Sequence, residues 1–302
     1  MYLQHFGLSE LPFTLTPNTQ FFLGLPSHHE ALQVLLTALD SGEGFIKVTG
    51  EVGTGKTLLC RKLLAELPDK YIAAYLPDPY LKPDELRLAV AQELGIEGLE
   101  SELSQQQVTQ LIQQKVMALT AEGQSVLIIL DEAQALTEDS IEAVRLFTNL
   151  ETESRKLVQI VLFGQPELDT RLAKPELRQV KQRISFSYQL RCLYQEEVQA
   201  YIQHRMAIAG YTGAPAFDQK SCDYIYRVSK GVPRIINILA HKCLMLCFGE
   251  NQHLVAKQHV QKAALDTESV ADNLPKDYAW AMVAAASLIG VAIAVGTWKV
   301  MA

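Results

Sequence analysis

Short apolar runs alternate with stretches of helical periodicity over the first two thirds of the chain. Continuous runs rich in β-branched residues predict strands, because a strand buried on both faces of a parallel sheet has little polar surface. These runs are residues 45–49, 71–76, 126–130, 157–163 and 184–190. Apolar spacings of three and four residues predict helices at 58–67, 84–94, 105–119 and 140–150. The alternation specifies an α/β fold in which a parallel five-stranded sheet carries helices on both faces.

The pattern changes near Tyr194, and no strand pattern follows as far as Asp266. Helical spacing and glycine or proline breaks predict four helices there, at 195–209, 218–229, 233–248 and 256–265. We therefore divide the chain into an α/β domain over 1–193, a small helical domain over 194–266 and a polar linker over 267–277.

Residues 278–298 form a stretch of 21 positions without a charged side chain. A helix of this length is roughly 31 Å long, close to the thickness of a bilayer's hydrocarbon core. Tyr278, Trp280 and Trp298 lie at its ends, where aromatic residues meet the membrane interfaces. The stretch predicts a single transmembrane helix, with a buried alanine-rich core helix as the alternative. Three small residues on one face allow helix association or arise by chance: Ala286, Gly290 and Ala294.

Composition and charge narrow the class of protein. A hydrophobic content of 48% and a charged content of 20% are typical of a globular chain. The net charge of −7 argues against a nucleic-acid partner. Five cysteines without zinc-site spacing indicate buried thiols in a reducing compartment. The N-terminus lacks the basic and apolar regions of a signal peptide.

Residues 50–57 read GEVGTGKT, a phosphate-binding loop between a predicted strand and a predicted helix. The loop and the first helical residue comprise Gly50, Glu51, Val52, Gly53, Thr54, Gly55, Lys56, Thr57 and Leu58. Glycines let backbone N–H groups surround a phosphate, and the helix N-terminus adds its dipole. Lys56 is the expected cation for the β- and γ-phosphates, and Thr57 the expected Mg²⁺ ligand. The motif predicts ATP and Mg²⁺ as cofactors; a glycine turn beside a solvated lysine is the alternative.

Asp131 and Glu132 follow the apolar run at 126–130. An aspartate at the carboxyl end of a central strand can hold the Mg²⁺ water shell, and the next glutamate can deprotonate an attacking water. An acidic turn that caps a helix is the alternative. Together with the glycine loop, the pair predicts Asp131 as a metal and nucleotide residue and Glu132 as the catalytic base.

Further segments make the sequence resemble a known family. They read HFGLSELPFTLTPN, GEVGTGKT, LIILDEAQ, FTNLE, VLFGQPEL, QRISFSYQLRCL and KGVPRIIN. In order and spacing they resemble the AAA+ ATPases, and within these the ExeA/GspA branch, over about residues 1–266. The resemblance implies a P-loop NTPase fold whose C-terminal helical domain acts as a lid.

The same resemblance implies roles for residues outside the loop. Gln165 matches the first sensor, and Arg234 matches the second sensor on the lid. Arg183 matches the arginine finger that reaches a neighbouring subunit's nucleotide, with Arg178 as its rival. His28 would line the adenine pocket. These roles imply a homo-oligomer, a ring or a dimer, that completes each ATP site at a subunit interface.

The resemblance and the apolar stretch together imply a location. The loop needs cytosolic ATP, so we expect a single-pass protein of the bacterial inner membrane with its N-terminal ATPase domain in the cytoplasm. The implied output is assembly of a type IV pilus of the MSHA kind or of a type II-like secretion machine, with other assembly proteins as partners. ExeA-type proteins continue into a peptidoglycan-binding region, whereas four residues follow 298 here. We therefore expect a partner to contact the cell wall.

Two other functions stay open. The same AAA+ branch resembles transposition ATPases of the TniB and MuB type, which would make the chain a DNA-binding regulator. The acidic balance and the apolar stretch argue against that function. The other is a nucleotide-bound scaffold that switches partners and hydrolyses ATP slowly.

Overall fold

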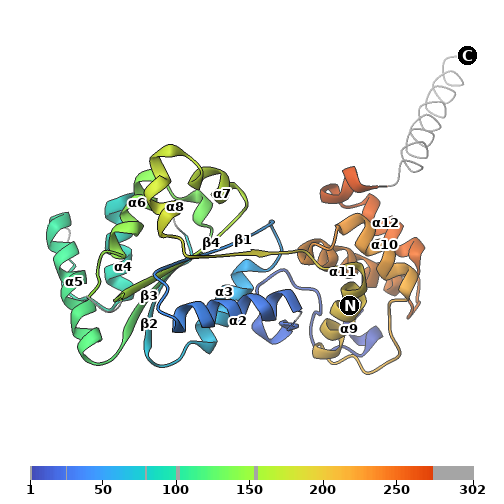
Figure 1. Cartoon of the computed structure of the whole chain (residues 1–302). Helices are drawn as coiled ribbons and strands as arrows, with labels where there is room; N and C mark the ends of the chain where they lie inside the picture. Colours follow the sequence, from blue (N-terminus) through green and yellow to red (C-terminus); the bar gives the residue numbers. More distant parts are fainter. Residues whose placement is uncertain (1, 25, 79, 100–102, 153–155, 275–302) are drawn as a thin grey trace, which may run out of the picture. The chain divides into compact units, whose positions relative to one another are not determined.

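The computed structural model describes residues 2–24, 26–78, 80–99, 103–152 and 156–274, which fall into two compact units (Figure 1). The unit Thr16–Cys192 contains the sheet. The other unit is helical and combines residues 1–15 with the residues from Leu193 onward.

The sheet has five parallel strands, as the sequence predicts, and their order is β2-β3-β4-β1-β5. Their bounds are β1 Phe45–Gly50, β2 Tyr71–Leu76, β3 Ser125–Leu130, β4 Val158–Gly164 and β5 Phe186–Leu190. In the register, Ile128 of β3 lies between Ala74 of β2 and Ile160 of β4. The central strands β3 and β4 are almost wholly buried, which explains why they read as continuous apolar runs.

Helices cover both faces of the sheet. Figure 1 shows α2 and α3 on one face and α4 with α6, α7 and α8 on the other. Their bounds are α2 Pro26–Asp40, α3 Lys56–Glu66, α4 Pro83–Glu93, α5 Gln105–Ala121, α6 Glu138–Phe147, α7 Glu167–Leu172 and α8 Arg178–Arg183. Short 3₁₀ turns add η1 Thr19–Phe21, η2 Ala133–Ala135 and η3 Pro175–Leu177. Alternate residues of β3 point to the two cores: Ile128 packs with α4 and α5, and Ile129 with α2 and α3.

The helical unit contains the four predicted helices: α9 Gln195–Ile208, α10 Gln219–Ser229, α11 Pro233–Gly249 and α12 Lys257–Leu265. The first fifteen residues, which the sequence analysis placed in the α/β domain, pack with this unit instead. Helix α1 Tyr2–Phe6 contacts α11 and buries Tyr2 and Phe6. Arg205 of α9 also donates a hydrogen bond to the carbonyl of Pro12 (2.6 Å). Burial of two aromatic rings and a guanidinium contact fix this segment to the helical unit.

The segment 267–277, predicted to be a linker, begins with ordered structure. Residues Glu268–Asn273 form the 3₁₀ turn η4, which buries Val270. The side chain of Asn273 donates to the carbonyl of Val228 in α10 (2.9 Å). The helical unit therefore extends to at least residue 274.

Within the described residues, no helix combines the length and apolar character needed to cross a bilayer. The predicted span at 278–298 lies outside the described residues, so it stays a prediction.

Candidate nucleotide-binding site

The glycine loop joins the carboxyl end of β1 to α3, as predicted. The loop tip is exposed at Glu51 and Val52, and α3 begins at Lys56. Gly55 has a φ of 101°, a left-handed conformation that favours glycine. A Cβ at this position would also lie 2.9 Å from Nε2 of His28. Residue 55 therefore has to be glycine for both backbone and steric reasons.

Lys56 points back into the loop and away from solvent. Its ammonium donates to the carbonyls of Gly50 (2.7 Å) and Glu51 (3.0 Å), and the residue is 5% exposed. Burial lowers the pKa of Lys56, and the nearby carboxylates, Glu132 first and Asp131 next, act in the opposite direction. A dehydrated cation held at a helix N-terminus is suited to a polyphosphate.

Asp131 directly follows the buried strand β3 and is 2% exposed. Burial raises the pKa of its carboxyl group, while hydrogen bonds from the side chain of Thr57 and from the backbone N–H of Glu132 lower it. The N–H of Glu132 lies 3.0 Å from Oδ1 of Asp131. Thr57 and Asp131, the two residues predicted to serve Mg²⁺, are thus in contact with each other beside the glycine loop.

Their chemistry fits magnesium. Mg²⁺ prefers oxygen ligands and usually takes one or two carboxylates, with water and substrate phosphates completing its shell. Thr57 and Asp131 supply a hydroxyl and a carboxylate oxygen in contact with each other. Over the described parts of the chain, no group of three or more His, Cys, Asp or Glu could hold a metal on protein ligands alone.

Glu132 adopts the left-handed backbone conformation (φ 51°), which is uncommon outside glycine and occurs at functional sites. Its Oε2 accepts hydrogen bonds from the side-chain amides of Gln134 (2.6 Å) and Gln165 (3.1 Å). Gln165, the predicted sensor, follows β4 directly and so reaches the end of the neighbouring strand β3. Gln134 is a residue that the sequence analysis quoted within LIILDEAQ but gave no role.

His28 lies on α2 and is 5% exposed. Its Nε2 donates to the carbonyl of Thr54 (3.0 Å), and its ring lies edge-on to that of Phe22 (5.8 Å between centroids). These contacts brace the glycine loop from outside. The predicted role in the adenine pocket stays a prediction.

The two candidate arginine fingers occupy opposite ends of α8. Arg183, the last residue, is half-buried and donates to Asn149 Oδ1 (3.1 Å) and Thr148 Oγ1 (3.4 Å) after α6. Arg178, the first residue, is exposed. Arg234 is the second residue of α11 in the helical unit, which begins at Pro233. The finger and second-sensor roles of these arginines stay predictions.

Comparisons with known proteins relate the chain to a domain family and to a secretion protein. Residues 39–172 match a family described as an AAA domain. The chain is 38% identical over 272 residues to general secretion pathway protein A of Aeromonas hydrophila. That match covers 90% of this chain and 49% of the relative, so the chain spans about half of the relative's length.

Solved structures share the fold. Cdc6p from Pyrobaculum aerophilum has a TM-score of 0.63 at 18% identity, covering 90% of this chain and 74% of that one. The Aeropyrum pernix ORC2 protein, in its ADPNP–ADP complexes, has a TM-score of 0.61 at 16% identity, covering 85% of this chain and 70% of that one. At these identities the likeness concerns the fold alone.

Proposed function

We propose that this chain is an AAA+ ATPase related to general secretion pathway protein A. On this premise, it powers assembly of a type IV pilus or a type II-like secretion machine at the bacterial inner membrane. The observation that carries the ATPase site is the meeting of Lys56, Asp131 and Glu132 at the carboxyl edge of the sheet. This edge is where ligands bind in open α/β folds.

The residues divide the chemistry among them. Lys56 and the loop N–H groups neutralise the β- and γ-phosphates of ATP. Thr57 and Asp131 would hold Mg²⁺, which supplies charge neutralisation to the phosphates when bound. Glu132 accepts a proton from the attacking water, and Gln165 holds the carboxylate of Glu132 from the adjoining strand.

The test of this site is Glu132→Gln. The substitution keeps the shape of the side chain but removes its basicity, so ATP binding should persist while turnover falls by about 100-fold or more. Glu122→Gln, on an exposed residue after α5, is the matched control. Normal hydrolysis by the Glu132→Gln protein, measured by phosphate release beside a fluorescent-nucleotide binding assay, would overturn the assignment.

The second part of the proposal is a site shared between subunits. Arg183 would leave its partners Asn149 and Thr148 to reach the neighbour's γ-phosphate, with Arg178 as the alternative finger. We expect Arg183→Ala to lose turnover and regain part of it when mixed with Glu132→Gln subunits, because each variant supplies what the other lacks. If Arg183→Ala were fully active and Arg178→Ala lost turnover, Arg178 would be the arginine finger.

The lid is the third part. Arg234 is the second residue of the long helix α11, and contact of its guanidinium with the γ-phosphate would let the helical unit respond to nucleotide state. Arg234→Ala should weaken the preference for ATP over ADP. An unchanged ratio of the two dissociation constants would contradict this role.

Membrane anchoring and the choice of machine complete the proposal. The uncharged stretch 278–298 supports a single C-terminal anchor, with the ATPase units in the cytoplasm. The resemblance to the MSHA pilus protein MshM supports type IV pilus assembly as the output. Fractionation of the intact chain should recover it in the inner membrane even after carbonate extraction. Recovery in the soluble fraction would overturn the anchor.

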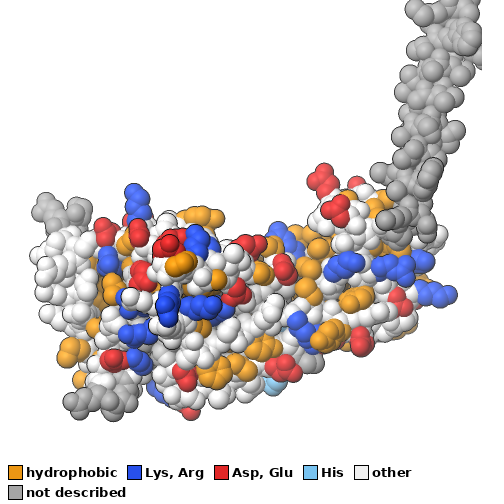
Figure 2. All heavy atoms as spheres, turned by 45° about the horizontal axis from the view of Figure 1, so that its top comes forward, with side chains coloured by type: hydrophobic (Ala, Val, Ile, Leu, Met, Phe, Trp, Pro, Cys, Tyr) orange, Lys and Arg blue, Asp and Glu red, His pale blue; other side chains and the backbone are white. Residues whose placement is uncertain are grey.

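A DNA-binding function has less support. On the face drawn in Figure 2, acidic and basic side chains are intermixed over the unit with the sheet. The net charge is −7. An ATP-dependent, salt-sensitive shift of duplex DNA would argue for the regulator instead.

A further inference from the structure

We propose that Gln134 is a positioning residue for catalysis, which orients the carboxylate of Glu132 and ties it to the end of β4. This inference deepens the proposed function and rests on Glu132 acting as the base. Gln134 lies in the 3₁₀ turn η2, two residues after Glu132. It neither follows the glycine loop nor lies on a strand, so its position alone predicts no role.

Gln134 uses both ends of its amide. Its Nε2 donates to Oε2 of Glu132 (2.6 Å), and its Oε1 accepts the backbone N–H of Gln165 (2.9 Å). The Gln165 side chain donates to the same Oε2 of Glu132 (3.1 Å). The guanidinium of Arg171 in α7 donates to the backbone carbonyl of Gln134. Two glutamines and one glutamate thus form a closed ring of hydrogen bonds between the ends of β3 and β4.

The ring fixes which way the Gln134 amide points. In the opposite orientation its oxygen would face the carboxylate of Glu132, and its NH₂ group would face the N–H of Gln165. Both contacts would be repulsive, so the hydrogen-bond network selects one orientation. A side chain shorter by one methylene would not span both partners at these distances.

The ring also selects which oxygen of Glu132 is available. Both amides bond to Oε2, and no described residue donates to Oε1. Of the carboxylates that raise the pKa of Lys56, Glu132 acts most strongly. The carboxylate is therefore held at one oxygen and left able to take a proton at the other.

Holding a base in one orientation supports the chemical step and leaves ground-state binding alone. Misplacement of a catalytic group by about 1 Å can lower a rate by about 100-fold. We therefore expect Gln134→Ala to lower kcat by about 10- to 100-fold, with KM for ATP and the affinity for ADP nearly unchanged. Gln114→Ala, on the exposed side of α5, is the matched control and should leave both constants unchanged.

Gln134→Glu separates positioning of Glu132 from simple support of the loop. Its carboxylate still accepts the N–H of Gln165 but has no hydrogen to donate to Glu132, and it adds a like charge there. We expect kcat at pH 8 to be as low as in Gln134→Ala.

The outcomes separate this inference from the function on which it rests. If Glu132→Gln is inactive but Gln134→Ala or Gln134→Glu turns over at the wild-type rate, the positioning role is wrong and the base stands. If Gln134→Ala raises KM without lowering kcat, Gln134 acts in binding and the inference also fails. In the double variant with Glu132→Gln, Gln134→Ala should cause no further loss, since the group it orients is gone. Normal activity of Glu132→Gln alone would instead remove the proposed function.

Discussion

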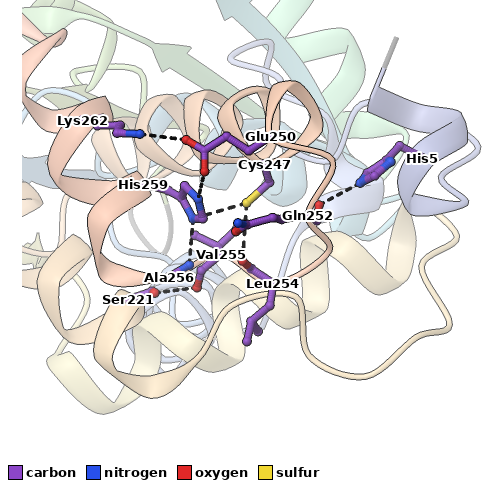
Figure 3. A network of polar contacts seen from close by, with 10 residues as sticks. All are labelled: His5, Ser221, Cys247, Glu250, Gln252, Leu254, Val255, Ala256, His259 and Lys262. Carbon is purple, nitrogen blue, oxygen red and sulfur yellow. Dashed lines mark hydrogen bonds and ion pairs between the residues drawn. The ribbon is translucent and has the colours of Figure 1, made fainter.

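Two polar clusters in the described part of this chain contain the residue types of a catalytic constellation, and they differ in how their hydrogen bonds are satisfied. The first surrounds Glu132 at the edge of the sheet. The second lies in the helical unit (Figure 3), where His259 stands between Cys247 (3.4 Å from Sγ to Nδ1) and Glu250 (3.1 Å from Oε2 to Nε2). A cysteine, a histidine and an acid in line are the parts of a nucleophilic triad.

The second cluster comprises Cys247, Glu250, His259 and Lys262, and we call it the His259 cluster. Its polar groups have hydrogen-bond partners, and its centre is shielded from solvent. Nδ1 of His259 accepts the backbone N–H of Ala256 (2.9 Å), which places the proton on Nε2, facing Glu250. The carboxylate of Glu250 also accepts a hydrogen bond from the ammonium of Lys262 (2.7 Å). His259 and Cys247 are fully buried, and burial raises the pKa of the Cys247 thiol to about 11. A protonated thiol without access to solvent is no nucleophile.

The Glu132 cluster has the opposite properties. It contains a dehydrated ammonium, a glutamate in a left-handed backbone conformation and a carboxylate oxygen without a donor among the described residues. A buried charge and a left-handed backbone at a residue other than glycine both cost stability, and an oxygen without a donor can accept a bond from a ligand. The contrast teaches that spare bonding capacity and access mark a site, whereas resemblance to a triad does not.

The largest expected effect comes from Lys56→Met. Nucleotide affinity should fall by more than about 100-fold, because the loop loses the cation that we propose for the β- and γ-phosphates. The melting temperature without nucleotide should stay the same or rise, since a buried charge is replaced by an apolar side chain. Titration with a fluorescent nucleotide and thermal unfolding measure the two quantities, with Lys62→Met on α3 as control. A large loss of stability would break the comparison.

His259→Ala should have the reverse signature. It leaves a cavity and removes the partners of Glu250, Cys247 and the Ala256 N–H, so the free energy of unfolding should fall by about 2–4 kcal/mol. Turnover per folded molecule should not change. Urea unfolding and ATPase assays at low temperature test this, with His29→Ala on an exposed position as control. If turnover fell and stability did not, the cluster would be functional after all.

The accessibility of the thiols gives a third check. Iodoacetamide at pH 8 should label the half-buried Cys192 while leaving Cys247 unmodified in the native protein. Both should react after unfolding. Peptide mass spectrometry reports the two sites in one sample, and equal native labelling of Cys247 would contradict its closed environment.

The smallest expected effect concerns a histidine without a full set of partners. His204 Nε2 is buried and finds no partner among the described residues, and burial, aided by Arg205, lowers the pKa of His204. The unfolded chain therefore takes up a proton as pH falls through about 6.5 while the folded chain resists it. This contribution to stability is present above that pH and is lost below it.

We expect His204→Gln to show a weaker fall in the free energy of unfolding between pH 7.5 and pH 5.5 than the wild type does. The carboxylates whose pKa is lowered in the folded state, such as Asp223, titrate below this window. An unchanged pH slope would show that folding does not lower the pKa of His204.

The sequence predicts most of the fold because its elements are separated by clear changes of period. The strands agree with the structure to within two residues, since buried parallel strands leave unmistakable apolar runs. Helices α7 and α8, with six residues each, are too short to show a period. The placement of residues 1–15 depends on packing against α11, which lies more than two hundred residues away in the sequence.

The residues of the site also differ in whether local sequence or distant packing determines their role. The loop from Gly50 to Thr57 and the pair Asp131 and Glu132 are contiguous, so their motifs carry the chemistry. Gln134 acquires its role only because β4 returns beside β3 and brings the N–H of Gln165 within reach.

The carbonyl cage around Lys56 has a consequence for how ATP enters. Two backbone oxygens at 2.7 and 3.0 Å replace water around the ammonium, much as carbonyls in a channel filter replace the hydration shell of a permeating ion. The dehydration of this cation is completed when the protein folds. An incoming phosphate then replaces carbonyl oxygens around an ammonium group that has already lost water. Binding of the phosphate therefore exchanges one set of hydrogen-bond acceptors for another around Lys56.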